Sequence, residues 1–111
     1  MHAFRLFLVF GWAAIAVVTV WAVVDLGLLA AAQTFLSDLQ HPWRAQFYFD
    51  LELHLFLLGG WIVWREGGSP SGFLAGLATL LLGALFTLTY LLVASIRAGG
   101  DVPRVLLGAR T

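Results

Sequence analysis

Three long runs of apolar residues, separated by short polar segments, dominate the pattern along this chain. The runs cover residues 4–24, 43–64 and 72–96, and each has roughly the 20 residues that an α-helix needs to cross a hydrocarbon core of about 30 Å. A lone strand cannot satisfy its backbone hydrogen bonds in lipid, so helices are favoured. The pattern therefore predicts an all-α integral membrane protein with three transmembrane helices in a single domain over residues 1–111.

The first run carries no charge after Arg5. A secretory signal peptide is the alternative, because His2 and Arg5 precede the run and residues 30–32 are small alanines that could be cleaved. The run is longer than the apolar region of a signal peptide, however, and the alanines lie well beyond its end. We therefore expect the first run to be an uncleaved membrane anchor.

The polar segments between the runs predict the connections. Residues 26–40 repeat apolar positions at helical spacing, which indicates a helical extension of the first span or a short helix lying in the membrane interface. Pro42 should end that helix and start the next, because proline disfavours helix in the residue before it. Residues 65–72 (REGGSPSG) are turn chemistry and predict a helical hairpin, and residues 97–111 form a short surface tail.

Small residues recur at intervals of three and four along the third run, so they line one stripe of the expected helix. In lipid, such a stripe lets two helix backbones approach closely and lets threonine hydroxyls bond across the contact. The predicted packing residues are Gly72, Gly76, Thr79, Gly83 and Thr87. The partner of this stripe is left open between the first helix, the second helix and another subunit.

Three crossings place the two termini on opposite sides of the membrane, so arginines can orient the chain. Arg5 and Arg65 fall on the amino-terminal side. Four arginines fall on the other side, namely Arg44, Arg97, Arg104 and Arg110. Because cytoplasmic segments carry the excess of basic residues, we expect a cytoplasmic carboxyl terminus in a bacterial-type inner membrane.

Composition narrows the class of protein further. The chain is 61% hydrophobic and 11% charged, against roughly 25% charged in soluble domains. It has no cysteine, which excludes disulfides, thiolate metal sites and cysteine nucleophiles. Its net charge of zero gives no basic face for nucleic acid, and it carries no phosphate-binding glycine loop or serine nucleophile elbow. We therefore expect no nucleic-acid partner, no enzyme activity and no metal site.

The middle of the second run carries three ionisable residues, Asp50, Glu52 and His54. An ionisable side chain at bilayer depth costs about 2.5–3.5 kcal/mol, so it usually serves a pairing, a cofactor or transport. At about 100° per residue, Asp50 and His54 share a helix face with Trp61, whereas Glu52 points to roughly the opposite side. The spacing therefore predicts two separate polar faces rather than one metal-binding cluster.

The Asp50–His54 face has three interpretations. The aspartate can hold the histidine as a structural contact inside a helix bundle. Alternatively, His54 can be an axial ligand of haem or of a chlorophyll-type pigment, with Trp61 stacking on the macrocycle. A third hypothesis is a proton or ion pathway through Asp50, His54 and Glu52, which would need oligomerisation or a partner to enclose water.

The stretch from His41 to Gly67 carries an aspartate early in the second span, Asp50, and closes on W-R-E-G at Trp64–Gly67. In these features it resembles small bacterial inner-membrane proteins of about this length, grouped only as a domain of unknown function. The resemblance implies a compact helical membrane protein with no established activity.

Together, the buried polar residues and the small-residue stripe require contacts that three helices provide only in part. We therefore expect a small non-catalytic membrane subunit or accessory factor of a larger complex. Its expected partners are membrane lipid and either other membrane subunits or further copies of itself. A cofactor carrier using His54 and a proton or ion pathway through Asp50 and His54 are the alternative functions.

Overall fold

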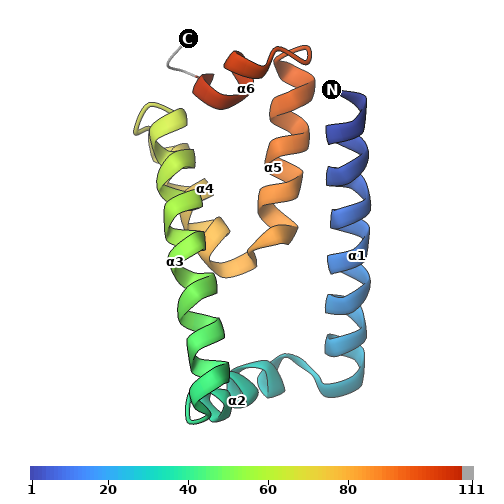
Figure 1. Cartoon of the computed structure of the whole chain (residues 1–111), viewed down its shortest axis with the longest axis vertical. Coiled ribbons are helices and arrows are strands. Elements are labelled where there is room, and N and C mark those ends of the chain that lie inside the picture. The colour runs from blue at the N-terminus through green and yellow to red at the C-terminus, as the bar shows by residue number, and fades with distance from the viewer. Residues whose placement is uncertain (109–111) are drawn as a thin grey trace.

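The computed structural model describes residues 1–108, and over this range the chain forms helices and no strands. The all-α prediction is therefore confirmed. Two long helices stand as the legs of a frame, a third lies across one end, and two shorter helices fill the other end (Figure 1). The helices are α1 His2–Leu26, α2 Leu28–Asp38, α3 Pro42–Arg65, α4 Pro70–Leu82, α5 Ala84–Arg97 and α6 Val102–Leu107.

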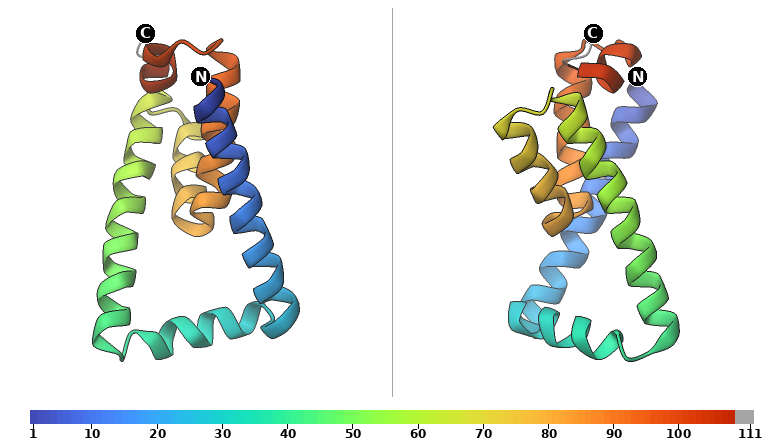
Figure 2. Two further views of the ribbon diagram at one scale, coloured as in Figure 1. Left: turned by 45° about the vertical axis from the view of Figure 1, so that its right-hand side comes forward. Right: turned by 90° about the vertical axis from the view of Figure 1, so that its left-hand side faces the viewer.

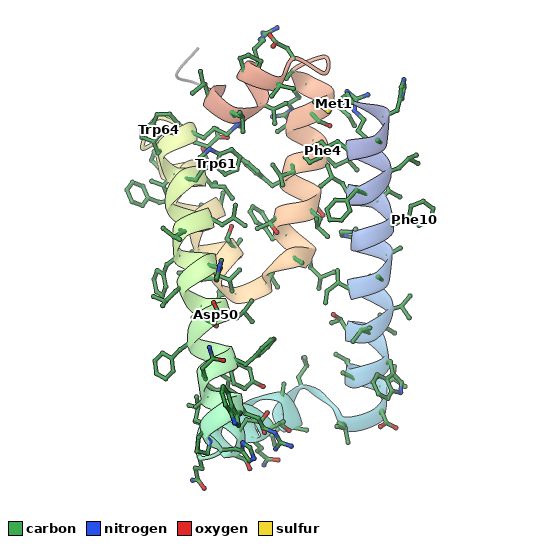
Figure 3. The ribbon with its side chains drawn as sticks, viewed as in Figure 1. Met1, Phe4, Phe10, Asp50, Trp61 and Trp64 are labelled. Carbon is green, nitrogen blue, oxygen red and sulfur yellow. The ribbon has the colours of Figure 1, made fainter. Side chains whose placement is uncertain are left out.

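The two legs, α1 and α3, are long and apolar enough to cross a membrane. At 1.5 Å per residue, their 25 and 24 residues extend about 37 and 36 Å. Large apolar side chains cover their outer surfaces; Phe10, for example, is 71% exposed and points away from the frame (Figure 3). The first two predicted spans therefore correspond to helices of membrane-crossing length.

A short helix crosses between the legs, as the pattern of residues 26–40 predicts. Gly27, at a φ of 85° that favours glycine, separates α1 from α2 and turns the chain sideways (Figure 1). At the far end of α2, Asp38 accepts hydrogen bonds from Arg44 at 3.1 Å and from the Tyr48 hydroxyl at 3.0 Å. Phe35 packs edge-on against the Tyr48 ring. These contacts fix α2 to the start of α3.

The third apolar run does not form one helix. Gly83, at φ 59° and ψ −130°, occupies a backbone region open essentially to glycine alone, and it separates α4 from α5. The two helices run in opposite directions, so the chain returns to the end from which α4 started (Figure 2). With 13 and 14 residues, each extends only about 20 Å. The prediction of a continuous helix over residues 72–96 is therefore wrong.

The small-residue stripe is divided between the two halves of this hairpin. Gly72, Gly76 and Thr79 are buried on α4, and Thr87 is buried on α5. Helix α4 packs on α3 and α5 packs on α1. Where α3 and α4 cross, a Cβ at Gly59 would lie 3.2 Å from the carbonyl oxygen of Gly76, so a larger residue would push the two backbones apart by a few tenths of an ångström. The partner of the α4 half is therefore the second leg.

Both described ends of the chain lie at the same end of the frame. The start of α1, the loop between α3 and α4, and α6 are at one end, whereas α2 is at the other (Figures 1 and 2). This differs from the expectation of termini on opposite sides, because the turn at Gly83 reverses the last part of the chain. Arg110, which entered that expectation, lies outside the described residues.

Candidate functional site

The predicted pair of Asp50 and His54 forms on the surface of α3. The Nδ1 atom of His54 lies 3.0 Å from Oδ1 of Asp50 and 2.7 Å from the Asp50 carbonyl oxygen. The two side chains are 73% exposed for His54 and 57% exposed for Asp50. Asp50 lies in the middle part of α3, away from either end (Figure 3). The pair is thus formed within one helix, with most of its surface uncovered by residues 1–108.

The hydrogen bonding of His54 determines which ring nitrogen is available. Both atoms near Nδ1 are oxygens, a carbonyl and a carboxylate, and these groups accept hydrogen bonds. Nδ1 must therefore carry the proton. In the neutral ring this leaves Nε2 with a free lone pair, the arrangement found in histidines that ligate metals while their other nitrogen donates to a carbonyl or carboxylate.

Trp61 has a different role from the one expected. It lies seven residues after His54 and so shares that face of α3. Its Nε1 donates a hydrogen bond to the Leu106 carbonyl at 3.1 Å, and its ring packs edge-on against Tyr90 at 6.3 Å between centroids. Figure 3 shows it near the top of α3, directed toward α6. Trp61 therefore fastens α3 to α5 and α6, so that its ring is not free to stack on a macrocycle at His54.

Glu52 lies apart from the pair. Its half-buried side chain lines a cavity of about 320 Å³ between α2 and α3, whose other walls are aromatic and aliphatic. Among residues 1–108, no hydrogen bond or ion pair involves the Glu52 side chain. The same residues contain no group of three or more histidine, aspartate or glutamate side chains that could hold a metal ion. A pathway that includes Glu52 therefore lacks a connection to the Asp50–His54 pair.

A more extensive polar cluster forms around Arg65, where α3 ends. Its side chain is only 11% exposed and donates to Glu66 Oε1 and to the Tyr90 hydroxyl, both at 2.9 Å. The Tyr90 hydroxyl in turn donates to the same glutamate oxygen. Arg65 also donates from Nε to the Val105 carbonyl at 2.6 Å and from Nη2 to the Arg104 carbonyl at 3.4 Å. One side chain thus joins α3, α5 and α6.

The last two contacts explain how a helix of six residues is held in place. The final carbonyls of any helix have no partner within the helix, and a cation near them is favourable. Arg65 and Trp61 donate to three carbonyls at the end of α6, of which the Arg104 carbonyl also accepts from the backbone N–H of Gly108. Gly108 follows directly, and a Cβ there would lie 2.6 Å from Arg65 Cγ. The end of α6 is therefore docked on the arginine.

The sequence interpretation missed this cluster. From the sequence, Arg65 is an orienting charge at the start of a polar turn, and Arg65 and Glu66 form at most a weak salt bridge at the span boundary. Trp61 and Arg65 are four residues apart and so share a helix face, and this spacing is the local sequence signal that could have indicated the cluster. Tyr90 and Val105 come from segments 25 and 40 residues away. Their approach depends on the reversal of the chain at Gly83.

Comparison of the chain with protein-family models, with curated proteins and with solved structures finds no match. The resemblance to small bacterial membrane proteins, carried by Asp50 and by W-R-E-G at Trp64–Gly67, is not tested by these comparisons and stays a prediction. The interpretation of function therefore depends on the geometry of the two polar sites.

Proposed function

We propose that the protein is a small, non-catalytic integral membrane subunit that binds a further protein chain through the Asp50–His54 face of α3. In this proposal α1 and α3 cross the membrane, and α4 and α5 enter it from one side as a re-entrant hairpin. The partner is either another subunit of a larger complex or a second copy of this chain. The observation that supports the proposal most strongly is the exposure of the Asp50–His54 pair.

The position of the pair along α3 makes its exposure costly. His54 is 12 residues after Pro42, about 18 Å along a helix of about 36 Å, and so it lies near the middle of the crossing. Asp50 lies one turn earlier, about 12 Å along α3, and an aspartate that faces lipid costs up to about 2.5–3.5 kcal/mol at the bilayer centre. More than half of the Asp50 side chain is uncovered by residues 1–108. A partner that supplies hydrogen bonds at this face would remove the cost, and that is the role we assign to it.

The distribution of arginines supports an orientation for this arrangement. Among residues 1–108, four arginines belong to the end of the frame that holds α6, whereas Arg44 alone belongs to the end that holds α2. The four are Arg5, Arg65, Arg97 and Arg104. By the positive-inside rule, the end with α6 is cytoplasmic in a bacterial-type inner membrane, together with the amino terminus.

Cross-linking tests the proposed contact. The chain has no native cysteine, so single cysteines report single positions. Leu57→Cys places a thiol on the Asp50–His54 face, and Phe56→Cys is the matched control about 100° around α3, with similar exposure of 74% and 61% for the native side chains. We expect a maleimide–benzophenone reagent, attached to the thiol and activated by light in membranes, to yield a defined cross-linked product from Leu57→Cys and much less from Phe56→Cys.

Two outcomes of this experiment are informative about the partner. A product of twice the chain mass identifies a second copy, and any other mass identifies a different subunit. Equal yields from both cysteines would contradict binding at this face. So would purification in mild detergent as a monodisperse monomer with no accompanying protein, provided that the detergent preserves other membrane complexes from the same cells.

A cofactor carrier is the second candidate function, because the Nδ1 proton of His54 is held by Asp50 and Nε2 remains available as a ligand. Haem or a chlorophyll-type pigment is the expected class of cofactor. This function predicts visible absorption in the purified native protein that disappears in His54→Ala. A colourless native protein would rule it out.

The proton or ion pathway predicts flux in liposomes that is lost in Asp50→Asn.

A further inference from the structure

The guanidinium groups of two arginines at the α6 end of the frame have no polar partner among residues 1–108. Arg97 ends α5 and Arg104 lies in α6, and both side chains are exposed. No hydrogen bond or ion pair to another described residue involves either guanidinium. Both line one open cavity of about 250 Å³, next to the Arg65 cluster. The cavity thus gathers two free cations at one place.

The remaining charges at this cavity compensate one another. Arg65 is paired with Glu66 at 2.9 Å, and the Tyr90 hydroxyl also donates to that carboxylate. Glu66 is the only acid among the residues that line the cavity within the described chain. The charge left over is therefore about two positive units, supplied by Arg97 and Arg104. A cavity with this excess is complementary to an anion.

The donors favour a phosphate group among anions. A guanidinium presents its N–H groups as a planar fork that binds two oxygens of a phosphate at once. The space is several times the roughly 30 Å³ that one water molecule takes up in the liquid. The cavity also has apolar walls from Val93, Ala94 and Ala98 on α5 and its end. Those walls suit a phosphate that carries an organic group.

We propose that this cavity binds the phosphate of an anionic phospholipid headgroup. The inference depends on the membrane placement proposed above, which puts the ends of α3 and α5 at the membrane surface. Trp64, 44% exposed at the same end of α3, has the amphipathic ring that is favoured at headgroup level. The headgroup phosphate would lie between Arg97 and Arg104, while Arg65 keeps the wall of the cavity in place.

Lipid selectivity of the full-length chain tests the inference. The protein is purified in a neutral detergent, supplied with equimolar phosphatidylglycerol and phosphatidylcholine, and the bound lipids are counted by native mass spectrometry. Wild type is expected to retain phosphatidylglycerol in preference. Arg97→Gln/Arg104→Gln should reduce that preference by about 30-fold, because each basic residue near an anionic lipid surface contributes about 1 kcal/mol and 1.4 kcal/mol is tenfold.

Arg44→Gln is the matched control, since it removes an exposed arginine at the opposite end of the frame. It should leave the preference unchanged. Equal retention of both lipids by wild type, or an equal loss of preference in Arg44→Gln, would overturn the inference. So would displacement of the lipid by millimolar inorganic phosphate, because that would identify the free anion as the ligand.

Failure of the membrane placement itself would look different. A wild-type chain that stays soluble without detergent and associates with no vesicle, whether of phosphatidylglycerol or of phosphatidylcholine, overturns both the placement and this inference. A chain that inserts into both kinds of vesicle with no preference overturns the headgroup site alone. Far-UV circular dichroism of Arg97→Gln/Arg104→Gln shows whether its helices are retained.

Discussion

Replacement of Arg65 by methionine should release α6 from the ends of α3 and α5. Methionine keeps an unbranched apolar stem but has no donor, so the carbonyls of Arg104 and Val105 and the carboxylate of Glu66 all lose a partner. The Tyr90 hydroxyl loses its donor as well. The buried Val105 side chain and the hydrogen bond from Trp61 still attach α6.

The size of the effect follows from the two hydrogen bonds that Arg65 donates to α6. A hydrogen bond that involves a charged group contributes about 1.5–3 kcal/mol. The bond to the Val105 carbonyl is 2.6 Å long and the bond to the Arg104 carbonyl is 3.4 Å long and weaker, so together they contribute about 3 kcal/mol. At 1.4 kcal/mol per factor of ten, the released state of α6 should become about 100-fold more populated.

Limited trypsin digestion measures this population. Cleavage after Arg104 requires access to a bond whose next residue, Val105, is 4% exposed when α6 is docked. When opening and closing are fast relative to cleavage, the rate follows the population of the open state, so cleavage at Arg104 should rise by about 100-fold in Arg65→Met. Arg44→Met is the control, because an exposed ion pair contributes only about 0.2–1 kcal/mol and this one lies at the opposite end.

Wild-type cleavage at Arg104 in a folded Arg65→Met protein would refute this reasoning. It would mean that Val105 and the Trp61 hydrogen bond hold α6 without the arginine. Cleavage that rises equally in Arg44→Met would instead show a general loosening, unrelated to the cluster. Arg65→Lys should give an intermediate rate, because lysine retains the charge but lacks the planar fork that reaches two carbonyls.

Two further substitutions test the helix contact and the polar pair. Gly76→Val should lower the free energy of unfolding in detergent by about 1–3 kcal/mol, since a Cβ there would lie 2.8 Å from Val63 Cγ2; Gly60→Ala, whose Cβ meets nothing within 4 Å, should be neutral or stabilising. Asp50→Asn should reduce partner binding without lowering the free energy of unfolding, because it removes a carboxylate that is costly at bilayer depth; a loss of stability would favour the purely structural interpretation.

Local signals predicted the legs of the frame and the helix between them. The lengths of the first two apolar runs, the proline at position 42 and the spacing in residues 26–40 each depend on neighbours along the chain. The contact between Asp50 and His54 also lies within one helix turn, and it forms as expected.

The reversal at Gly83 could not be predicted from the same signals. Glycine is common in membrane helices, so its presence inside an apolar run does not indicate a break. Tertiary contacts favour the break. Helix α4 packs on α3 across Gly59 and Gly76, and α5 packs on α1, where Gly11 leaves room for Leu88. The Arg65 cluster depends on this reversal, so it was missed together with it.

The most direct measurement labels single cysteines from the two sides of the membrane in a chain that has no native cysteine. Ser69→Cys lies before α4, Asp101→Cys lies after α5, and His41→Cys lies at the other end of the frame, before α3. With α1 and α3 as the crossings and α4–α5 as a re-entrant hairpin, a membrane-impermeant maleimide should label Ser69→Cys and Asp101→Cys from one side and His41→Cys from the other. Labelling of Asp101→Cys from the same side as His41→Cys would contradict the hairpin and establish a third crossing.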